Sequence, residues 1–467
     1  MFRHESFDRS LFNAAPARPL ALDPGFRPLA LGVRAYRKAL AAHGSRERVV
    51  LGLEQNAGWA ARLELDVFPG GADADSQRYV SWMLNGLLWA CGGSRAAISG
   101  PRALCEAIAG EYGPRGPWAF EREIMGLAYS RPFSVEVMDE VPAPTPRPLA
   151  LGGNLEGCRI GFDLGASDYK VAAVRDGEVV FSAELPWNPK AEADPAYHYA
   201  RINEGFRLAA GHLPRLDAIG GSSAGILVDN QVKVASLFRA VPPGPFEAQV
   251  RPLFLRLREE WGVPLEVIND GDVTALAGGL SLERNGILGI ALGSSEAVGF
   301  LDRSGRITGW LNELAFGCVD ANPMAGTDDW SGEPGVGAAY FSQQALDRLA
   351  GPAGFVVPPG MALPERLRDV QERLARGDSA SREFFLTIGA YLGYTLPWYA
   401  EFYDLEHAMI LGRVTSGEGG ELILARAREV LEAEFPEVAA RVQVFLPDEK
   451  SRRVGQAVAA ASLPPLS

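Results

Sequence analysis

The chain has 467 residues, a formal net charge of -13 and 47% hydrophobic residues. This length predicts two or three domains, and this composition is that of a globular protein with mixed surface charge. The acidic balance argues against a general nucleic-acid binder, because such proteins need a basic face.

Cysteine usage and hydropathy indicate a reducing setting away from membranes. Cys91, Cys105, Cys158 and Cys318 are scattered and form no CxxC pair, so we expect reduced core thiols. No run of about 18 apolar residues is present to span a bilayer, and the N-terminus lacks an apolar signal core. We therefore expect a cytoplasmic protein with neither a membrane nor a nucleic acid as its partner.

The first 155 residues are predicted to form an additional α/β domain. Apolar residues at helical spacing predict helices near 33–43 and 76–92, and strands are expected at 49–55, 60–68, 96–100 and 133–141. Residues 142–154, PAPTPRPLALGGN, have the composition of a linker. A domain boundary is therefore placed there.

From residue 158 onward strands alternate with helices, which predicts an α/β fold with mostly parallel sheets covered by helices. A first block is expected to contain a hairpin unit at 159–183, strands at 216–226 and 265–270, and helices at 197–212, 246–261 and 272–280. A second block is expected to contain strands at 286–292, 407–413 and 442–447, a hairpin at 298–310, and helices near 336–350, 364–376, 379–402, 419–434 and 451–461.

Each block starts with an apolar strand that runs into a turn of small residues. In the first, Asp163 is followed by Gly165 and Ser167; in the second, the turn is Gly293-Ser294-Ser295. Small residues let backbone N–H groups approach a phosphate, and a nearby carboxylate can serve a magnesium ion. Two such turns facing one cleft would hold a polyphosphate from both sides. Alternatively, both turns are ordinary steric features of α/β hairpins.

Between the blocks, an apolar strand ends on Asn269-Asp270-Gly271-Asp272. Active sites of open α/β sheets lie at this carboxyl edge. There Asp270 could act as a general base that takes a proton from an attacking hydroxyl, and Asn269 could bind hydroxyls. The alternative is that Asn269 or Asp270 only caps the next helix. Asp272 is at least as well placed for capping, which would leave Asp270 available.

Two later segments add candidate contacts. Glu313, which follows Trp310 and Asn312, could bind a polyol, although a solvated surface Glu is the alternative. The stretch from Gly412 through Ser416 and Gly417 is a glycine-rich loop between a strand and a helix. Such a loop can hold an adenine or ribose, or present a helix N-terminus to a phosphate.

In this order the segments resemble the sugar-kinase, Hsp70 and actin superfamily, and within it the ROK family (repressor, open reading frame, kinase). The resemblance covers residues 158–462. The matching residues, in the order of the family's motifs, are Asp163, Gly165 and Ser167; Ser222 to Gly225; Asn269 and Asp270; Gly293, Ser294 and Ser295; Glu313; Gly412 to Gly420; and Gly455 in the closing helix.

The resemblance implies a two-lobed actin-like ATPase (ribonuclease H-like) fold. Its lobes would span 156–285 and 286–467, with helix 451–461 packing back on the first lobe. It also implies ATP and Mg as cofactors, Asp270 as catalytic base, Asp163 as a magnesium partner through water, and possible homodimers. The implied sugar contacts are Ser223, Gly225, Asn269, Asn312 and Glu313, and the implied nucleotide contacts are Asp163, Gly165, Ser167, Gly293, Ser294, Ser295, Gly412, Ser416 and Gly417.

The chain departs from the family pattern after Glu313. Ala315-Phe316 stands where the family has Gly-His, and the following loop has a single cysteine, Cys318. One thiolate cannot build a tetrahedral zinc site without three more ligands, so we predict no structural zinc, and the resemblance does not fix the sugar.

The sequence thus predicts a kinase that phosphorylates a small sugar or sugar-like hydroxyl, or alternatively a non-catalytic sugar- or nucleotide-binding regulatory protein. A DNA-binding repressor is disfavoured because no basic DNA-reading helix is found.

Overall fold

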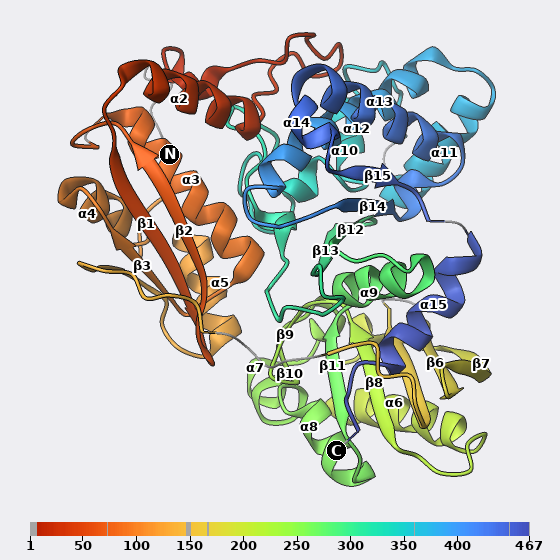
Figure 1. Cartoon of the computed structure of the whole chain (residues 1–467). Coiled ribbons are helices and arrows are strands. Elements are labelled where there is room, and N and C mark those ends of the chain that lie inside the picture. The colour runs from red at the N-terminus through yellow and green to blue at the C-terminus, as the bar shows by residue number, and fades with distance from the viewer. Residues whose placement is uncertain are drawn as a thin grey trace.

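The computed structural model describes residues 7–71, 73–145, 151–165, 168–358, 360–447 and 449–466. Figure 1 shows an N-terminal α/β domain (red to orange) beside two stacked lobes, of which the green and yellow one is first in sequence. In the described ranges, no helix combines the length and apolar character needed to cross a bilayer. The four cysteines are all buried there and form no disulfide.

The N-terminal domain is a four-stranded sheet in the order β2-β1-β3-β4 with helices against it. The antiparallel strands β1 and β2 form a hairpin, β3 pairs antiparallel with β1, and β4 runs parallel to β3. The expected strands and the helices expected near 33–43 and 76–92 are present, and the domain also contains α4 and α5. Their bounds are β1 (Glu47–Gln55), β2 (Gly58–Val67), β3 (Arg95–Ser99), β4 (Ser134–Val137), α2 (Leu29–His43), α3 (Ala74–Cys91), α4 (Arg102–Glu111) and α5 (Ala119–Tyr129).

The first lobe contains a five-stranded sheet in the order β11-β8-β5-β6-β7, in which β5, β8 and β11 are parallel. A small antiparallel hairpin, β9–β10, follows β8. The bounds are β5 (Cys158–Leu164), β6 (Asp168–Arg175), β7 (Glu178–Pro186), β8 (Ala218–Ser223), β9 (Ile226–Val228), β10 (Gln231–Val234), β11 (Leu265–Asn269), α6 (Pro195–Ala210), α7 (Pro243–Pro245), α8 (Leu253–Trp261) and α9 (Asp270–Leu282).

The second lobe contains a four-stranded sheet in the order β13-β12-β14-β15. Its bounds are β12 (Ile287–Leu292), β13 (Glu296–Leu301), β14 (His407–Leu411), β15 (Gln443–Phe445), α10 (Ala345–Leu349), α11 (Leu363–Ala375), α12 (Ser379–Tyr399), α13 (Glu418–Glu434), α14 (Pro436–Ala439) and α15 (Glu449–Ala461). The expected hairpin over 298–310 does not extend as predicted, because after Leu301 only Ile307 makes isolated bridges, to Leu301 and Leu151. The expected helix 336–350 is also shorter.

Helices α9 and α15 lie between the two sheets (Figure 1). Glycines make this close packing possible. A Cβ on Gly220 of β8 would lie 1.8 Å from the carbonyl oxygen of Ala460 in α15, and one on Gly271 of α9 would lie 2.3 Å from that of Val298 in β13. These contacts join α15 to the first lobe and the start of α9 to the second lobe.

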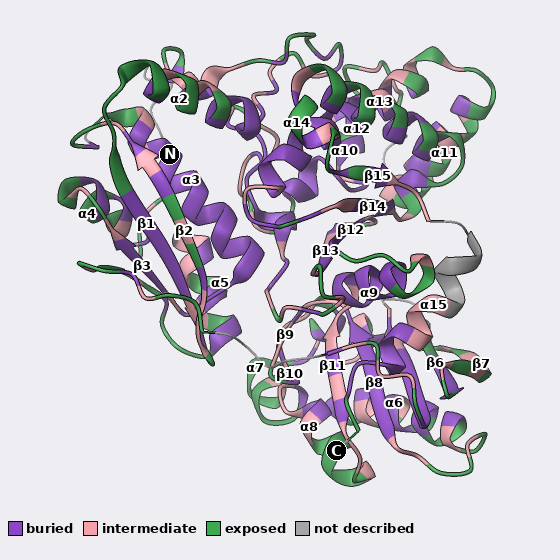
Figure 2. Cartoon of the chain, in the orientation of Figure 1, coloured by how far each residue is buried: buried purple, intermediate pink, exposed green. Residues whose placement is uncertain are grey.

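The apolar core of the N-terminal domain does not end at residue 155 but continues into the second lobe. From Arg78 onward helix α3 is buried on all sides (Figure 2), and its buried residues include the polar side chains of Arg78, Ser81 and Asn85. One side packs on its own sheet. On the other, Gly86 lies so close to Phe402 and Trp398 that a Cβ would be 2.4 Å from the Phe402 ring. The first 155 residues therefore share their apolar core with the second lobe, and the domain boundary near residue 155 stays a prediction.

The glycine contacts predict that an added methyl group lowers the stability of the protein at a tightly packed glycine and not at an open one. Gly220→Ala should destabilise the protein by about 1–3 kcal/mol, because the new Cβ has to push α15 away from β8. Gly110→Ala in α4 is the control, because no atom lies within 4 Å of its Cβ position. Chemical denaturation measures both, and equal stability of the two variants would contradict this packing.

Candidate functional site

The carboxyl edge of the first-lobe sheet gathers the predicted polar residues. Asp163 pairs with Ser222 across β5 and β8, and Ser223 pairs with Asn269 across β8 and β11. The Ser222 hydroxyl donates a hydrogen bond to Asp163 Oδ1 at 2.5 Å. The negative charge of Asp163 contributes to a raised pKa at Asp270, so the two carboxyls lie close enough to interact.

The start of α9 corrects one prediction. Asn269, not Asp272, caps this helix, because Asn269 Oδ1 accepts a hydrogen bond from the backbone N–H of Gly271 at 2.7 Å. Asp272 turns toward the second lobe and accepts hydrogen bonds from Asn312 Nδ2 at 2.7 Å and from the backbone N–H of Phe300 at 3.2 Å. Asp272 therefore links the first lobe to the second lobe through hydrogen bonds.

Glu313 is positioned by the C-terminal end of α3. The last carbonyls of a helix lack partners within the helix. Those of Trp89, Ala90 and Cys91 accept hydrogen bonds from the backbone N–H groups of Glu313, Asn312 and Leu311, at 3.0, 2.9 and 3.1 Å respectively. The N-terminal domain thereby holds the segment that carries Glu313.

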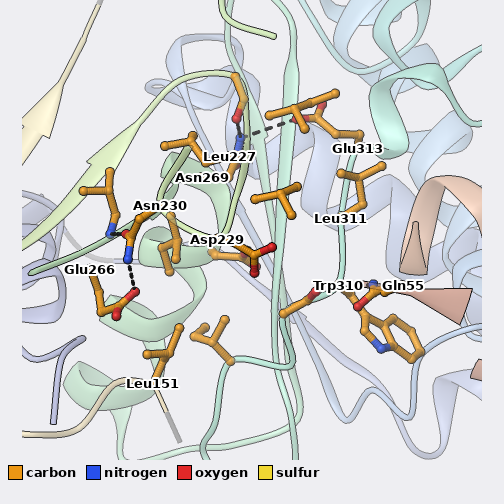
Figure 3. Close-up of a pocket in the computed structure, with 18 of the residues that line it drawn as sticks. Gln55, Leu151, Leu227, Asp229, Asn230, Glu266, Asn269, Trp310, Leu311 and Glu313 are labelled. Atoms are coloured by element: carbon orange, nitrogen blue, oxygen red, sulfur yellow. Dashed lines mark hydrogen bonds between the residues drawn. The ribbon is translucent and has the colours of Figure 1, made fainter. Parts of the chain in front are cut away.

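The Glu313 side chain is half-buried and points toward Asn269 (Figure 3). Asn269 Nδ2 donates to Glu313 Oε1 at 3.5 Å and to the carbonyl oxygen of Gly225 at 3.0 Å. Glu313 is therefore not the solvated surface residue of the alternative interpretation. Three predicted site residues, Gly225, Asn269 and Glu313, lie together.

Three carboxyls of the site have raised pKa values. Burial, and secondarily the charge of Asp163, raises the pKa of Asp270 to about 6. Burial raises the pKa of Asp272 to about 7, and burial together with the charges of Asp270 and Asp272 raises that of Glu313 to about 8. Near neutral pH, Asp270 can therefore be an ionised proton acceptor while a protonated Glu313 can donate a hydrogen bond.

Asn312 and Ser223 are buried rather than open to a ligand. Asn312 donates to Asp272, and its Oδ1 accepts a hydrogen bond from the Tyr403 hydroxyl at 2.8 Å. Ser223 is 1% exposed, and its hydroxyl donates to the carbonyl oxygen of Ala224 at 3.5 Å. A sugar contact from either side chain stays a prediction, and for Asn312 it would require existing hydrogen bonds to break.

A cavity of about 130 Å³ opens beside Asn269 and Glu313 (Figure 3). Walls from the first lobe, the 307–313 segment and the N-terminal domain enclose it. The sequence did not single out most of its polar and aromatic lining, which comprises Gln55, Asn56, Tyr129, Asp229, Asn230, Glu266 and Trp310. Among the described residues that line it, none is Lys, Arg or His.

Asp229 and Asn230 form the turn between β9 and β10. Both have positive φ, 54° and 57°, as in the two-residue turns that match the twist of a hairpin. The Asp-Asn pair between two short apolar runs was a usable sequence signal for this turn. Asn56 Nδ2 donates to Asp229 Oδ2 at 3.1 Å, and no sequence signal could have found this contact between separate domains.

A second cavity, of about 280 Å³, lies between α9, β14 and α15 and is lined by Gly412 and Ser416. Gly412 packs so closely on the end of β12 that a Cβ would be 2.4 Å from the carbonyl oxygen of Leu292. The predicted nucleotide turns at 293–295 and 412–417 are therefore neighbours. Gln456 Nε2 donates to Thr274 Oγ1, which donates to the Asp270 carbonyl oxygen.

Several of the remaining predicted nucleotide contacts lie on exposed turns. Ser294, Ser295, Ser416 and Gly417 are exposed, and α13 begins directly after Gly417. The carbonyl oxygen of Gly165 accepts a hydrogen bond from Trp187 Nε1 at 2.9 Å. Ser167 lies outside the described residues. The turns thus offer backbone and hydroxyl groups of the kind that contact phosphates.

The available carboxylates limit the ways in which the described residues could bind a metal ion. No group of three or more His, Cys, Asp or Glu side chains in the described part of the chain could hold a metal ion by itself. Magnesium is instead commonly bound through one or two carboxylates together with substrate phosphates and water. Asp163 and the adjacent Asp270 fit that donor set.

Glu296 begins β13 directly after the 293–295 turn and is buried. Its Oε1 accepts a hydrogen bond from the Tyr399 hydroxyl at 3.2 Å, its Oε2 has no partner, and burial raises its pKa to about 8. The folded protein therefore holds a proton that the unfolded chain releases near its ordinary pKa of about 4. The associated stability is complete below about pH 4 and is lost as pH rises through about 8.

Glu296→Gln removes this titration and keeps an acceptor for Tyr399. We expect the melting temperature of the variant, relative to the unmodified protein, to increase between about pH 5 and about pH 8 and then to level off. Exposed Glu432→Gln in α13 is the matched control. A difference that stays constant with pH would contradict the buried, protonated Glu296.

Comparison with solved structures confirms the predicted fold. The chain is similar to a ROK hexokinase from Thermus thermophilus, with a TM-score of 0.52 and 18% identity over 66% of this chain and 97% of that chain. It is also similar to a ROK family transcriptional regulator, a homologue of the E. coli MLC protein, with a TM-score of 0.52 and 17% identity over 78% of this chain and 88% of that one. No family model and no curated protein matches the chain.

Proposed function

We propose, on the premise of this ROK-type fold, that the protein is an ATP-dependent phosphotransferase that acts on a hydroxyl of a sugar or sugar-like molecule. One observation carries the proposal. The carboxyl of Asp270 interacts electrostatically with Asp163 on the predicted phosphate side and with Glu313 at the cavity. A base in this position could take the proton of a bound hydroxyl as it attacks phosphorus.

The nucleotide would lie across the neighbouring turns of the second lobe. Gly412 and Ser416 would contact its nucleoside in the cavity between α9, β14 and α15, and Ser294 and Ser295 would contact its phosphates. Asp163 would hold magnesium through water. When bound, magnesium supplies positive charge that neutralises phosphate oxygens during transfer.

The cavity beside Glu313 would hold the accepting sugar. Asn269 and protonated Glu313 would orient hydroxyls, and Trp310 offers an aromatic face to the ring. Carboxyls from Asp229 and Glu266 also line this cavity, and its described lining contains no basic side chain. A neutral or amine-bearing sugar suits these charges better than a sugar acid or a sugar phosphate does, because like charges repel at short range.

The second candidate function is a non-catalytic regulatory protein that binds a sugar or nucleotide. Two observations favour it: the likeness to the ROK transcriptional regulator covers 78% of this chain, compared with 66% for the hexokinase, and Ala315-Phe316 replaces the family's Gly-His. The presence of Asp270 at the sheet edge favours the kinase, because a protein that only binds has no need of a base.

Asp270→Asn distinguishes the two functions. In an assay of ADP release with Mg-ATP and a panel of neutral and amino sugars, kcat should fall by about 10²–10⁴-fold, which is the usual contribution of a positioned base. Nucleotide binding measured by calorimetry should persist. Exposed Asp329→Asn carries the same charge change outside the site and serves as the control.

Unchanged turnover in Asp270→Asn would overturn the assignment of the base. ATP binding without turnover on any sugar of the panel would instead favour the regulatory function.

Asn56→Ala tests whether the N-terminal domain forms part of the sugar site. Removing the hydrogen bond to Asp229 should raise KM for the sugar by about 2–10-fold, as expected for one hydrogen bond, and leave KM for ATP unchanged. Exposed Asn285→Ala, outside the cavity, is the control. Equal changes in both KM values would show that the contact has no specific role in sugar binding.

A further inference from the structure

A third cavity, of about 200 Å³, lies on the other side of α3, between the N-terminal domain and the 316–336 segment. Aromatic rings form much of its wall, with Trp82 from α3, Trp118 at the start of α5 and Phe316 from the second lobe. This volume is below the roughly 300 Å³ at which drug-sized pockets begin, so it suits a small molecule with one ring or a short branched chain.

A buried carboxyl oxygen at this cavity lacks a partner. Glu121 of α5 is 1% exposed. Its Oε1 accepts hydrogen bonds from Asn85 Nδ2 at 2.9 Å and Trp89 Nε1 at 3.3 Å, whereas its Oε2 accepts none. Buried polar atoms are almost always hydrogen-bonded, because leaving one unpaired is costly. Because Glu121 lines the cavity, its unpaired Oε2 is the acceptor that a donor entering the cavity would use.

Two other polar groups of the wall, Asp320 and the Trp118 indole, have hydrogen-bond partners within the protein. Asp320 accepts hydrogen bonds from the backbone N–H of Arg27 and from the Tyr340 hydroxyl. The indole N–H of Trp118 donates to Ser81 Oγ at 2.8 Å. With these two groups paired, the unpaired Glu121 Oε2 favours a ligand that donates a hydrogen bond.

The charge at this cavity is negative. Glu333 also lines it, and its carboxylate lies close enough to Glu121 to contribute to the raised pKa of that group. None of the described lining residues is Lys, Arg or His. Aromatic faces attract cations through their ring quadrupole, so the rings and the carboxyls favour the same kind of ligand.

We propose that this cavity is a binding site for a small apolar amine, whose ammonium group donates to Glu121 Oε2 while its apolar body packs against Trp82, Trp118 and Phe316. The site is separate from the proposed sugar and nucleotide cavities and does not depend on phosphotransfer. A charge-assisted hydrogen bond is about twice as strong as a neutral one, so the ammonium group distinguishes the ligand from an equally large alcohol.

The test compares 2-phenylethylamine with the isosteric 2-phenylethanol by calorimetric titration of the full chain. At about pH 8.5, above the pKa of about 7 that burial gives Glu121, the carboxyl is ionised. We expect the amine to bind roughly tenfold more tightly than the alcohol. Glu121→Gln should abolish this preference and leave binding of the alcohol unchanged.

Two further variants test whether the preference for the amine arises from Glu121 and whether the probes bind in this cavity. Glu123→Gln changes the same charge on an exposed position of α5 and should retain the preference. Ala321→Leu fills the cavity from the opposite wall and should weaken binding of both probes, even if Glu121→Gln does not fold. The proposal is overturned if the two probes bind equally or if neither binds. It is also overturned if amine binding changes with neither Glu121→Gln nor Ala321→Leu, because the amine would then be bound elsewhere, for example in the acidic cavity beside Glu313.

Discussion

The arrangement of the candidate site depends on the hydrogen bonds between the last carbonyls of α3 and the backbone of residues 311–313. A helix end would otherwise leave these carbonyls without partners, and here they fix the segment that carries Glu313. Asn269 of the first lobe donates a hydrogen bond to Glu313. The first lobe, the 311–313 segment and the N-terminal domain therefore meet at this contact. The N-terminal domain is in this sense a structural component of the site and not an appendage.

A second constraint is the contact between α9 and β13. The close approach at Gly271 and Gly299 places the start of α9, which carries Asp270 and Asp272, directly against β13. Asp272 is stabilised there by Asn312 and the Phe300 N–H, while Asp270 is left to interact with Asp163 and Glu313. Such raised pKa values are typical of functional sites, although structural networks produce them too.

Much of the site's sequence pattern could be predicted because it is local. Asn269 and Asp270 follow an apolar strand, and parallel strands place their ends at one edge of the sheet. Asp272 was misinterpreted because its position near a helix start resembles that of a cap. In the tertiary structure β13 lies against it, and its carboxyl accepts a hydrogen bond from the backbone N–H of Phe300. That Gln55 and Asn56 line the cavity could not be predicted, since they reach it only after two domains pack.

The sequence by itself determined the order of strands, helices and small-residue turns, and hence an α/β fold, because hydrophobic period and turn chemistry act over a few neighbouring residues. The two-lobed arrangement was implied by the resemblance of these ordered segments to the ROK family. Only the tertiary structure decided which carboxyls are buried beside one another and that α3 is shared between the N-terminal domain and the second lobe. It also decided that Glu121, whose Oε2 has no hydrogen-bond partner, lines a separate cavity. These features arise from packing between residues far apart in the chain, and burial then sets their charge states.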